Sequence, residues 1–195
     1  MEIKPRQLEI IEATGKILTQ SGVNGLTIKR LADEMNFSES AIYRHFESKE
    51  DIILTLLKYL TQNISVILDK IPCTSDADED LKTVFRRITV YFKENPYFAV
   101  AVFSEGLLDE SLRVRDTIMN LVGMMTRHLL SIIERGQQEN KFITTIVAGD
   151  LAQIVLATYK QLMFTWRFQN FEFNITKSVD KMTDTFLLIL KNHPD

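Results

Sequence analysis

The segment that decides the fold is TIKRLADEMNFSESAIYRHFESKE, residues 27–50. Thr27 has the side chain of a helix N-cap, and the apolar residues after it recur at helical spacing. Asn36 is one of the few residues other than glycine that readily adopts a left-handed backbone, so it predicts a tight turn. Ser38 can then cap a second short helix over residues 39–46. Two short helices around a tight turn predict a helix-turn-helix.

The residues on both sides of this segment also predict helices. Residues 5–21 carry an apolar stripe, begin with a proline and end before Gly22, so this helix would pack against the other two. Further helices are expected over about 49–71, 78–94, 97–107, 111–140, 147–169 and 175–192. Pro72 would end the first of these, and the acidic residues 74–80, TSDADED, are expected to form a surface loop. We therefore expect an all-α protein of about nine helices.

The composition agrees with a helical protein of the cytoplasm. The 195 residues are 45% hydrophobic and 25% charged, with only 7 glycines and 4 prolines. No apolar run reaches the roughly 18 residues of a membrane span, and the N-terminus does not resemble a secretory signal. The single Cys73 cannot form an intramolecular disulfide, and its acidic neighbours disfavour the thiolate of a redox sensor.

The charge alone does not indicate a nucleic-acid-binding protein. The formal net charge is −3, and residues 1–50 carry seven Lys or Arg against eight Asp or Glu. A local basic rim could still form from Lys4, Arg6, Lys29, Arg44 and Lys49. In the helix over 39–46, Ala41, Ile42 and Phe46 should face inward, with His45 near the rim and Glu39, Ser40, Tyr43 and Arg44 outward. By spacing alone, that outer face is equally a base-reading surface or a solvated face.

A resemblance favours the first reading. Residues 10–54, IIEATGKILTQSGVNGLTIKRLADEMNFSESAIYRHFESKEDIIL, resemble the DNA-binding domain of the TetR family of transcriptional regulators. The similarity includes Thr, Leu and Ala at 27, 31 and 32, Tyr, His and Phe at 43, 45 and 46, and SKE at 48–50. Asn36 replaces a turn glycine of the family, and Gly15 stands where the family tends to be apolar.

The resemblance implies the roles of individual DNA-binding residues. Thr27, Tyr43, His45 and Lys49 align with positions that commonly hold DNA phosphates, and Glu39, Ser40, Ala41 and Arg44 lie at or near base-facing positions. The hydroxyl of Ser38 can also bind a phosphate, and Lys29 belongs to the basic rim. Glu39 stands where a basic or neutral residue is usual, so it would either accept a hydrogen bond from a cytosine amine or repel the backbone.

The resemblance divides the chain into a DNA-binding domain over residues 1–48 and a ligand-binding and dimerisation domain over 49–195, joined by the long fourth helix. Residues 81–168 are rich in Met and aromatic side chains, which suit an adaptable apolar pocket for a small apolar or amphipathic effector. The expected lining is Phe85, Phe92, Phe98, Phe103, Met124, Phe164 and Trp166, with Arg86, His128 and Gln161 as polar anchors. Each large side chain can equally be ordinary core, and His128 a partly exposed helix residue.

These features together predict a ligand-responsive transcriptional repressor. It would bind palindromic operator DNA as a homodimer formed by the last two helices, with no membrane partner, cofactor or metal. An enzyme is disfavoured because the three histidines lack metal-ligand spacing and the chain has no Gly-rich phosphate loop or nucleophile elbow. The remaining alternative is a protein-interaction module of the same fold that has lost DNA binding, which the near-neutral N-terminal domain favours.

Overall fold

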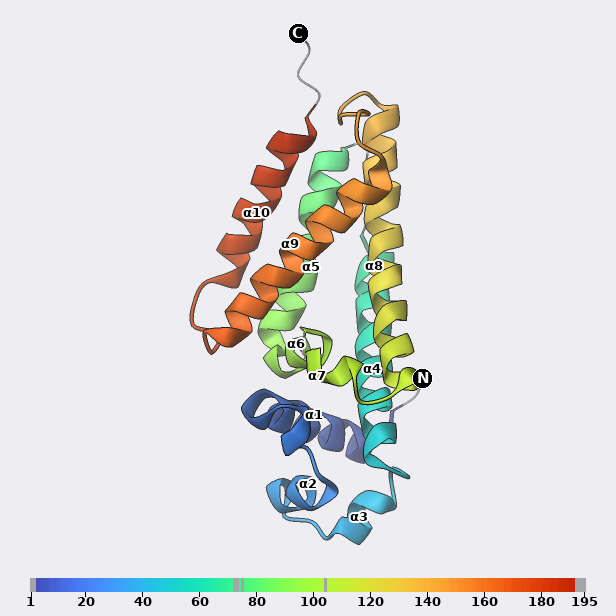
Figure 1. Ribbon diagram of the computed structural model, residues 1–195, viewed down its shortest axis with the longest axis vertical. Helices are drawn as coiled ribbons and strands as arrows, with labels where there is room; N and C mark the ends of the chain where they lie inside the picture. The colour runs from blue at the N-terminus through green and yellow to red at the C-terminus, as the bar shows by residue number, and fades with distance from the viewer. Residues whose placement is uncertain (1–2, 72–73, 75, 104, 192–195) are drawn as a thin grey trace. The chain divides into compact units, whose positions relative to one another are not determined.

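The protein is built from ten α-helices and one short 3-10 helix within the described residues (Figure 1). The structure is a computed structural model that describes residues 3–71, 74, 76–103 and 105–191. The elements are α1 Pro5–Ser21, η1 Val23–Gly25, α2 Ile28–Met35, α3 Glu39–Tyr43, α4 Lys49–Asp69, α5 Ala77–Glu94, α6 Pro96–Phe103, α7 Glu105–Leu108, α8 Leu112–Gln138, α9 Ala148–Phe168 and α10 Ile175–Leu190. The predicted all-α fold is confirmed. The count exceeds nine because residues 97–107 form two helices, α6 and α7, instead of one.

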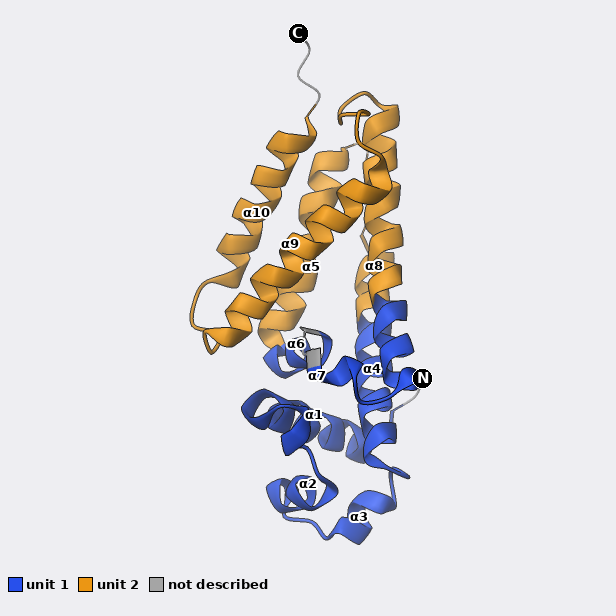
Figure 2. Ribbon diagram, viewed as in Figure 1, with its two compact units in different colours: residues 1–63, 95–121 blue, residues 64–94, 122–195 orange. Residues whose placement is uncertain are grey.

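The chain forms two compact units, which Figure 2 distinguishes by colour. Unit 1 comprises Met1–Asn63 and Asn95–Leu121, and unit 2 comprises Ile64–Glu94 and Val122–Asp195. Helices α4 and α8 therefore each contribute their N-terminal part to unit 1 and their C-terminal part to unit 2. This division follows packing, whereas the boundary expected after residue 48 is one of function and stays a prediction.

In unit 1, α1 packs against α2 and α6. Pro5 occupies the first position of α1, and Gly22, at φ 65°, ends it by donating its N–H to the carbonyl of Leu18 at 3.0 Å. Gly15 lies where α6 approaches closely, since a Cβ built on it would stand only 3.0 Å from the Cβ of Tyr97 and 3.5 Å from its carbonyl oxygen. A mid-helix glycine costs about 1 kcal/mol relative to alanine, and this close approach explains why one is present.

In unit 2, α10 packs against α5 and α9, as Figure 1 shows. The rings of Phe85 on α5 and Tyr159 on α9 lie 5.0 Å apart, centroid to centroid. The buried hydroxyls of Thr89 and Tyr159 form a hydrogen bond of 3.1 Å. Burial raises the pKa of Tyr159, and the hydrogen bond to Thr89 offsets only part of that rise, so this phenol stays neutral.

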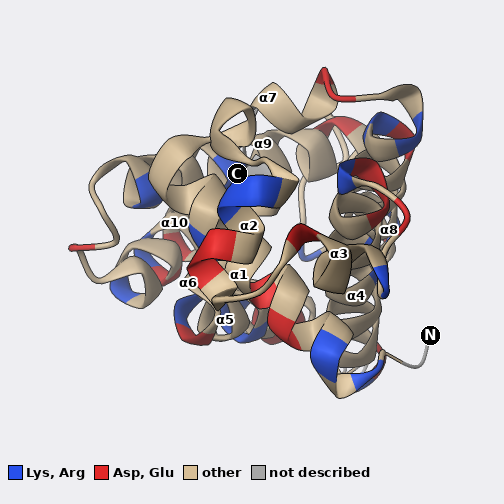
Figure 3. Ribbon diagram, turned by 90° about the horizontal axis from the view of Figure 1, so that it is seen from below, with Lys and Arg blue, Asp and Glu red and all other residues tan. Residues whose placement is uncertain are grey.

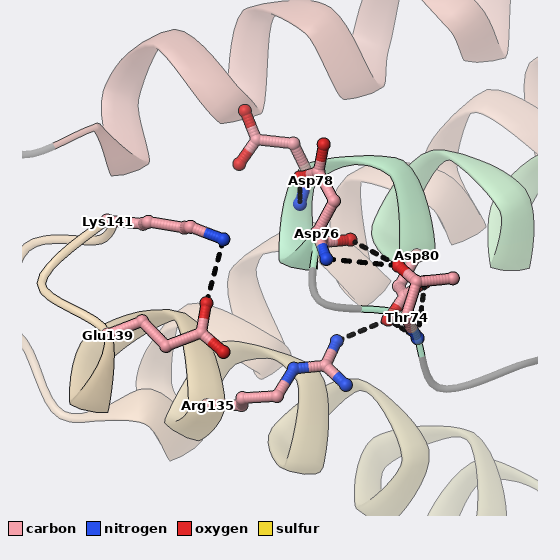
Figure 4. Close-up of polar contacts among 7 residues, drawn as sticks. All are labelled: Thr74, Asp76, Asp78, Asp80, Arg135, Glu139 and Lys141. Carbon is pink, nitrogen blue, oxygen red and sulfur yellow. Dashed lines mark hydrogen bonds and ion pairs between the residues drawn. The ribbon is translucent and has the colours of Figure 1, made fainter.

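The acidic segment before α5 differs from its prediction. The surface loop expected over residues 74–80 is wrong from residue 77 onward, because α5 begins at Ala77, one residue before the helix expected over 78–94, and Asp80 is buried. The Asp80 carboxylate accepts hydrogen bonds from the backbone N–H of Thr74 at 3.0 Å and from its hydroxyl at 2.7 Å, and it forms an ion pair with Arg135 of α8 (Figure 4). Burial alone would raise the pKa of Asp80, but the bonds from Thr74 and Arg135 outweigh it and hold the pKa below its usual value.

Several helix ends also differ from the sequence-based expectation. Helix α3 ends at Tyr43 instead of Phe46, because the N–H groups of His45 and Phe46 both bond to the carbonyl of Ile42 in a tight turn. Helix α4 ends at Asp69, two residues before the expected Ile71. Pro72 and Cys73, on which the predicted helix stop and the thiol argument depend, lie outside the described residues, as does His193.

One helix in the described part of the chain, α4, is long and apolar enough to cross a membrane by length and composition alone. Most of its apolar side chains are instead buried in the protein, as in the core helix of a globular fold, although Val66 is 43% exposed. The buried residues are Ile52, Ile53, Leu54, Leu56, Leu57, Leu60, Ile64 and Leu68.

Candidate nucleic-acid interface

Local hydrogen bonds set the geometry of the two short helices α2 and α3. The Thr27 hydroxyl accepts from the N–H of Arg30 at 3.1 Å and caps α2. Asn36 ends α2 in a left-handed conformation, φ 54° and ψ 43°, and the N–H of Phe37 then bonds to the carbonyl of Ala32 at 2.8 Å. The Ser38 hydroxyl accepts from the N–H of Ala41 at 3.2 Å and caps α3. The helix-turn-helix is therefore present as predicted.

Helix α3 has one buried and one exposed face. Ile42, together with Phe46 just after the helix, is buried, while Ala41 is half-buried. The opposite face is exposed and consists of Glu39, Ser40, Tyr43 and Arg44, with 53% of Tyr43 accessible. His45 is half-buried, and its carbonyl accepts a hydrogen bond of 3.3 Å from the side chain of Gln7 on α1. This bond attaches the turn after α3 to α1, so the exposed face is held in a fixed orientation within unit 1.

The hydroxyl groups beside this face keep hydrogen-bonding capacity for a partner. A hydroxyl has one proton to donate and two lone pairs to accept, and the Thr27 hydroxyl uses only a lone pair in capping α2. Its proton can therefore be donated to a phosphate oxygen. The hydroxyls of Ser38 and Ser40 lie 2.9 Å apart and bond to each other, so one of their two protons is free.

Four cations of the predicted basic rim fall into two groups, and the fifth, Lys4, is exposed at the N-cap of α1. Lys29 and Arg44 are exposed, and neither takes part in an ion pair among the residues that the structure covers. Arg6 pairs with Glu9 and also lies over the ring of Phe37, 5.1 Å from its centroid, while Lys49 pairs with Glu110. Figure 3 shows Lys and Arg interspersed with Asp and Glu over α1, α2 and the start of α4. The rim is therefore a few separate cations and not a continuous basic surface.

The start of α4 has polar contacts that the sequence did not reveal. The hydroxyl of Ser48 accepts from the N–H of Asp51 at 3.1 Å and caps the helix. The next two residues both contact the connection between α7 and α8: Lys49 pairs with Glu110, and the Glu50 carboxylate accepts from the Ser111 hydroxyl at 2.6 Å. Glu50 and Ser111 are 61 residues apart in sequence, and no local pattern links them.

Comparisons with known proteins agree with this geometry. Residues 10–56 match the model of a family described as bacterial regulatory proteins, tetR family. The nucleoid occlusion factor SlmA of Vibrio atlanticus, strain LGP32, is 30% identical over 142 residues, which cover 70% of this chain and 71% of that protein. The chain belongs to the TetR family. It is thus an all-α, helix-turn-helix transcription regulator of a DNA-binding family, as its sequence predicted.

Solved structures of bacterial regulators share the fold. The fatty acid degradation regulator FadR of Bacillus halodurans matches with a TM-score of 0.83 at 17% identity, over 96% of this chain and 97% of that chain. FadR of Bacillus subtilis, solved in complex with stearoyl-CoA, matches with a TM-score of 0.80 at 20% identity, over 96% and 100% of the two chains. At these identities the likeness concerns the fold alone.

The residues expected to bind an effector of this TetR-family protein lie in different surroundings. Phe85, Phe92 and Trp166 are buried in unit 2, and Trp166 Nε1 has no hydrogen-bond partner among the described residues. Phe164 is half-buried and stacks on the exposed Phe168, with ring centroids 6.1 Å apart. In unit 1, Phe98 is buried with its ring 5.8 Å from that of Tyr59. The side chain of Phe103 lies outside the described part of the structure.

The expected polar anchors are also separated. Arg86 is exposed and pairs with Asp180 of α10 at 3.1 Å, and Gln161 is exposed on α9. His128 and Met124 lie together in a pocket of 280 Å³ between α4 and α8, which they line with Ser65, Leu68, Asp69, Arg127 and Ser131. Burial lowers the pKa of His128, although Asp69 and Asp80 act in the opposite direction, so its imidazole is predominantly neutral at neutral pH.

A larger, mainly apolar groove of 750 Å³ runs between α9 and α10. Its lining includes Ile154, Leu162, Met182 and Ile189, and Gln161 belongs to it too. Ile154 is 51% and Ile189 60% exposed, so large aliphatic side chains of both helices face outward here. Contiguous exposed apolar surface is a common property of interaction sites.

Proposed function

We propose that the protein is a ligand-responsive repressor that binds palindromic operator DNA as a homodimer. The observation that carries this proposal is the exposed row Ser40, Tyr43 and Arg44 on α3, held out by the buried Ile42 and Phe46. In a helix-turn-helix, the second helix enters the major groove and presents such side chains to the base edges.

Each DNA-binding residue has a proposed role. Thr27, Ser38 and Tyr43 bind phosphates through their hydroxyls, His45 through its imidazole ring, and Lys29 and Lys49 through their ammonium groups. Arg44, Ser40 and Ala41 contact or approach the bases, where an arginine most often binds guanine. Glu39 accepts from the amine of a cytosine, since an exposed carboxylate in this row would otherwise repel the phosphates.

The groove between α9 and α10 supports the proposed dimer interface. Its exposed Ile154 and Ile189 would be buried when the same two helices of a second copy pack against it. Such a dimer places two α3 helices for successive major grooves, about 34 Å apart. In such a dimer Gln161, which lines the groove, would lie at the interface, and it also remains a proposed polar anchor for the effector.

The effector is proposed to be small and apolar or amphipathic. The buried aromatic residues Phe85, Phe92 and Trp166 support an apolar site, and the stearoyl-CoA of the Bacillus subtilis FadR complex, though larger, is an amphipathic ligand. Trp166 Nε1, which has no acceptor among the described residues, could donate to the polar end of such a ligand. The remaining candidates are Phe98, Phe103, Met124 and Phe164, with Arg86 and His128 as anchors.

Binding of the effector would act on DNA through α4. Residues 1–48 are the proposed DNA-binding domain, and residues 49–195 the ligand-binding and dimerisation domain. A displacement of α4 would change the separation of the two α3 helices and weaken binding to a fixed operator. The protein is proposed to act in the cytoplasm, without catalysis and without a cofactor.

A second candidate is an interaction module of the same fold that no longer binds DNA. The mixed charges around α1 and α2 and the pairing of Lys49 with Glu110 favour it. A salt titration of binding to the double-stranded DNA upstream of the protein's own gene separates the two. Phosphate contacts make affinity fall steeply with salt, with a slope of about 0.9 per neutralised phosphate on logarithmic axes. Absence of binding to any genomic fragment at low salt would reject the repressor.

A further inference from the structure

The connection between α7 and α8 presents an acid to a cation that is expected to hold DNA. Glu110 lies in this connection and forms an ion pair with Lys49, the first residue of α4. The pair is partly shielded from water, since the Lys49 side chain is 33% exposed and that of Glu110 is 20% exposed. All the groups involved belong to unit 1. Such a pair is less screened by salt than a fully exposed one.

The connection is held in place by contacts that do not involve Lys49. The Ser111 hydroxyl donates to the Glu50 carboxylate at 2.6 Å and accepts from the N–H of Val114, which caps α8. Arg113 adds a longer contact to Glu50, 3.4 Å between Nη1 and Oε2. Glu110 is therefore kept beside Lys49 even when their own ion pair is broken, because Ser111 and Arg113 anchor the neighbouring backbone to the same turn of α4.

Lys49 cannot form a strong ion pair with Glu110 and with a DNA phosphate at the same time. An ammonium has three protons to donate, but a phosphate drawn toward Lys49 also approaches the carboxylate of Glu110, and two anions repel at short range. Lys29 and Arg44 differ in this respect, since neither is paired with an acid in the part of the chain that the structure covers.

We propose that Glu110 competes with the DNA backbone for Lys49 and thereby lowers the protein's affinity for all DNA sequences. The inference rests on the proposed function, because it takes Lys49 as a phosphate contact. Glu110 is a positioning residue in this scheme: it acts on DNA only through Lys49. On binding DNA, the ion pair of Lys49 with Glu110 is replaced by one with a phosphate. The phosphate contact of Lys49 therefore contributes less to the free energy of DNA binding than that of an unpaired lysine.

The scheme has two measurable consequences. Removal of the Glu110 charge leaves Lys49 free before binding, so affinity rises, on the order of 5- to 10-fold for one charge-assisted contact. The dependence of affinity on salt becomes steeper by up to about 0.9 in its logarithmic slope, because no carboxylate is left to take up a cation when Lys49 moves to the phosphate. Both effects are equal for specific and non-specific duplexes, since phosphate contacts carry no base information.

The experiment measures DNA binding of Glu110→Gln over a range of salt concentrations, on a duplex that the wild-type protein binds and on a non-specific duplex. Gln has nearly the same shape and removes only the charge. The matched control is Asp109→Asn, which makes the same charge change one residue away, at an 87% exposed side chain with only a 4.0 Å contact to Arg115. We expect a gain for Glu110→Gln and a small, screened change for Asp109→Asn.

A double-mutant cycle with Lys49→Ala tests the route of the effect. When Lys49 is alanine, the gain from Glu110→Gln should fall to the small change seen for Asp109→Asn. A gain that keeps its full size without Lys49, a gain in the wild-type background no larger than that of Asp109→Asn, or a loss of affinity would each overturn the inference. Glu110→Asp, whose shorter side chain reaches Lys49 less well, should give a smaller gain and provides a second variant if Gln does not fold. Wild-type protein that binds no DNA rejects the proposed function itself, whereas unresponsive Glu110 variants of a DNA-binding protein reject only this inference.

Discussion

Asp80 and Arg135 form an ion pair that links the first turn of α5 to the last part of α8. The carboxylate is almost fully buried, with 4% of its side chain exposed, and the guanidinium is 20% exposed. Thr74 completes the coordination of the carboxylate with two further donors (Figure 4). A buried charge of this kind tolerates the loss of its partner poorly.

Arg135→Met should therefore destabilise the protein by about 3 kcal/mol, because Asp80 remains buried without its counter-ion. The measurement is the free energy of unfolding from denaturant titration. Arg86→Met is the matched control, since it removes an arginine whose ion pair with Asp180 is exposed, and it should cost less than about 1 kcal/mol. Equal losses for the two variants would contradict the structural role of the buried pair.

The lowered pKa of Asp80 predicts a pH dependence with a definite sign. A carboxylate with a lower pKa in the folded than in the unfolded state stabilises the fold above its unfolded pKa, about 3.9, and this contribution disappears as the pH falls through the folded value. The stability difference between wild type and Asp80→Asn should thus be full at pH 6 and shrink below about pH 4. A difference that stays constant from pH 6 to pH 2 would show that the charge of Asp80 does not matter.

The exposed face of α3 predicts two classes of DNA-binding variant. Tyr43→Phe removes a hydroxyl assigned to phosphate, so it should weaken binding to all sequences alike, by about 1 kcal/mol. Arg44→Gln and Ser40→Ala should instead change the preferred bases, with effects of about 1–3 kcal/mol at single positions. Binding to a panel of single-base operator variants distinguishes them. A changed rank order of operators with Tyr43→Phe would place Tyr43 against a base.

The groove between α9 and α10 predicts a variant that separates the subunits. Ile189→Asp puts a charge into the proposed interface, so the protein should become monomeric and lose operator affinity by about 100-fold, as two half-sites are no longer bound together. Sedimentation and DNA binding measure the two effects. Leu112→Asp, at a 71% exposed leucine of α8 outside the groove, is the control and should remain dimeric. If the Ile189→Asp protein remained dimeric, the dimer interface would have to lie outside the groove between α9 and α10.

The helix-turn-helix could be predicted because its signals are local. The caps at Thr27 and Ser38 bond to N–H groups only three residues ahead, and the left-handed turn depends on Asn36 itself. A short stretch of sequence therefore contains everything that determines the turn. The same reasoning predicted the ends of α1 and α2 at the residues where the structure has them.

Contacts between distant residues could not be predicted in this way. Asp80 and Arg135 are 55 residues apart, so no local pattern showed that the acidic start of α5 would be buried against a counter-ion from α8. The ion pair between Lys49 and Glu110 could not be predicted either, because these two residues are also far apart in the sequence. Effector residues are harder still, because large apolar side chains at helical spacing look alike whether they fill a core, as Phe85 does, or stack near the surface, as Phe164 does.

The glycine in α1 has a mechanical consequence. Most helix pairs meet through interdigitating side chains, which can change rotamer and so absorb a small displacement of one helix. At Gly15, α1 contributes no side chain to the contact, because its backbone itself faces the Cβ and the carbonyl of Tyr97 on α6. No side chain of α1 at this point can change rotamer to accommodate a shift of α6 toward it. Such a shift would therefore displace α1 as a whole. The absence of a side chain at Gly15 therefore couples the positions of α1 and α6 directly.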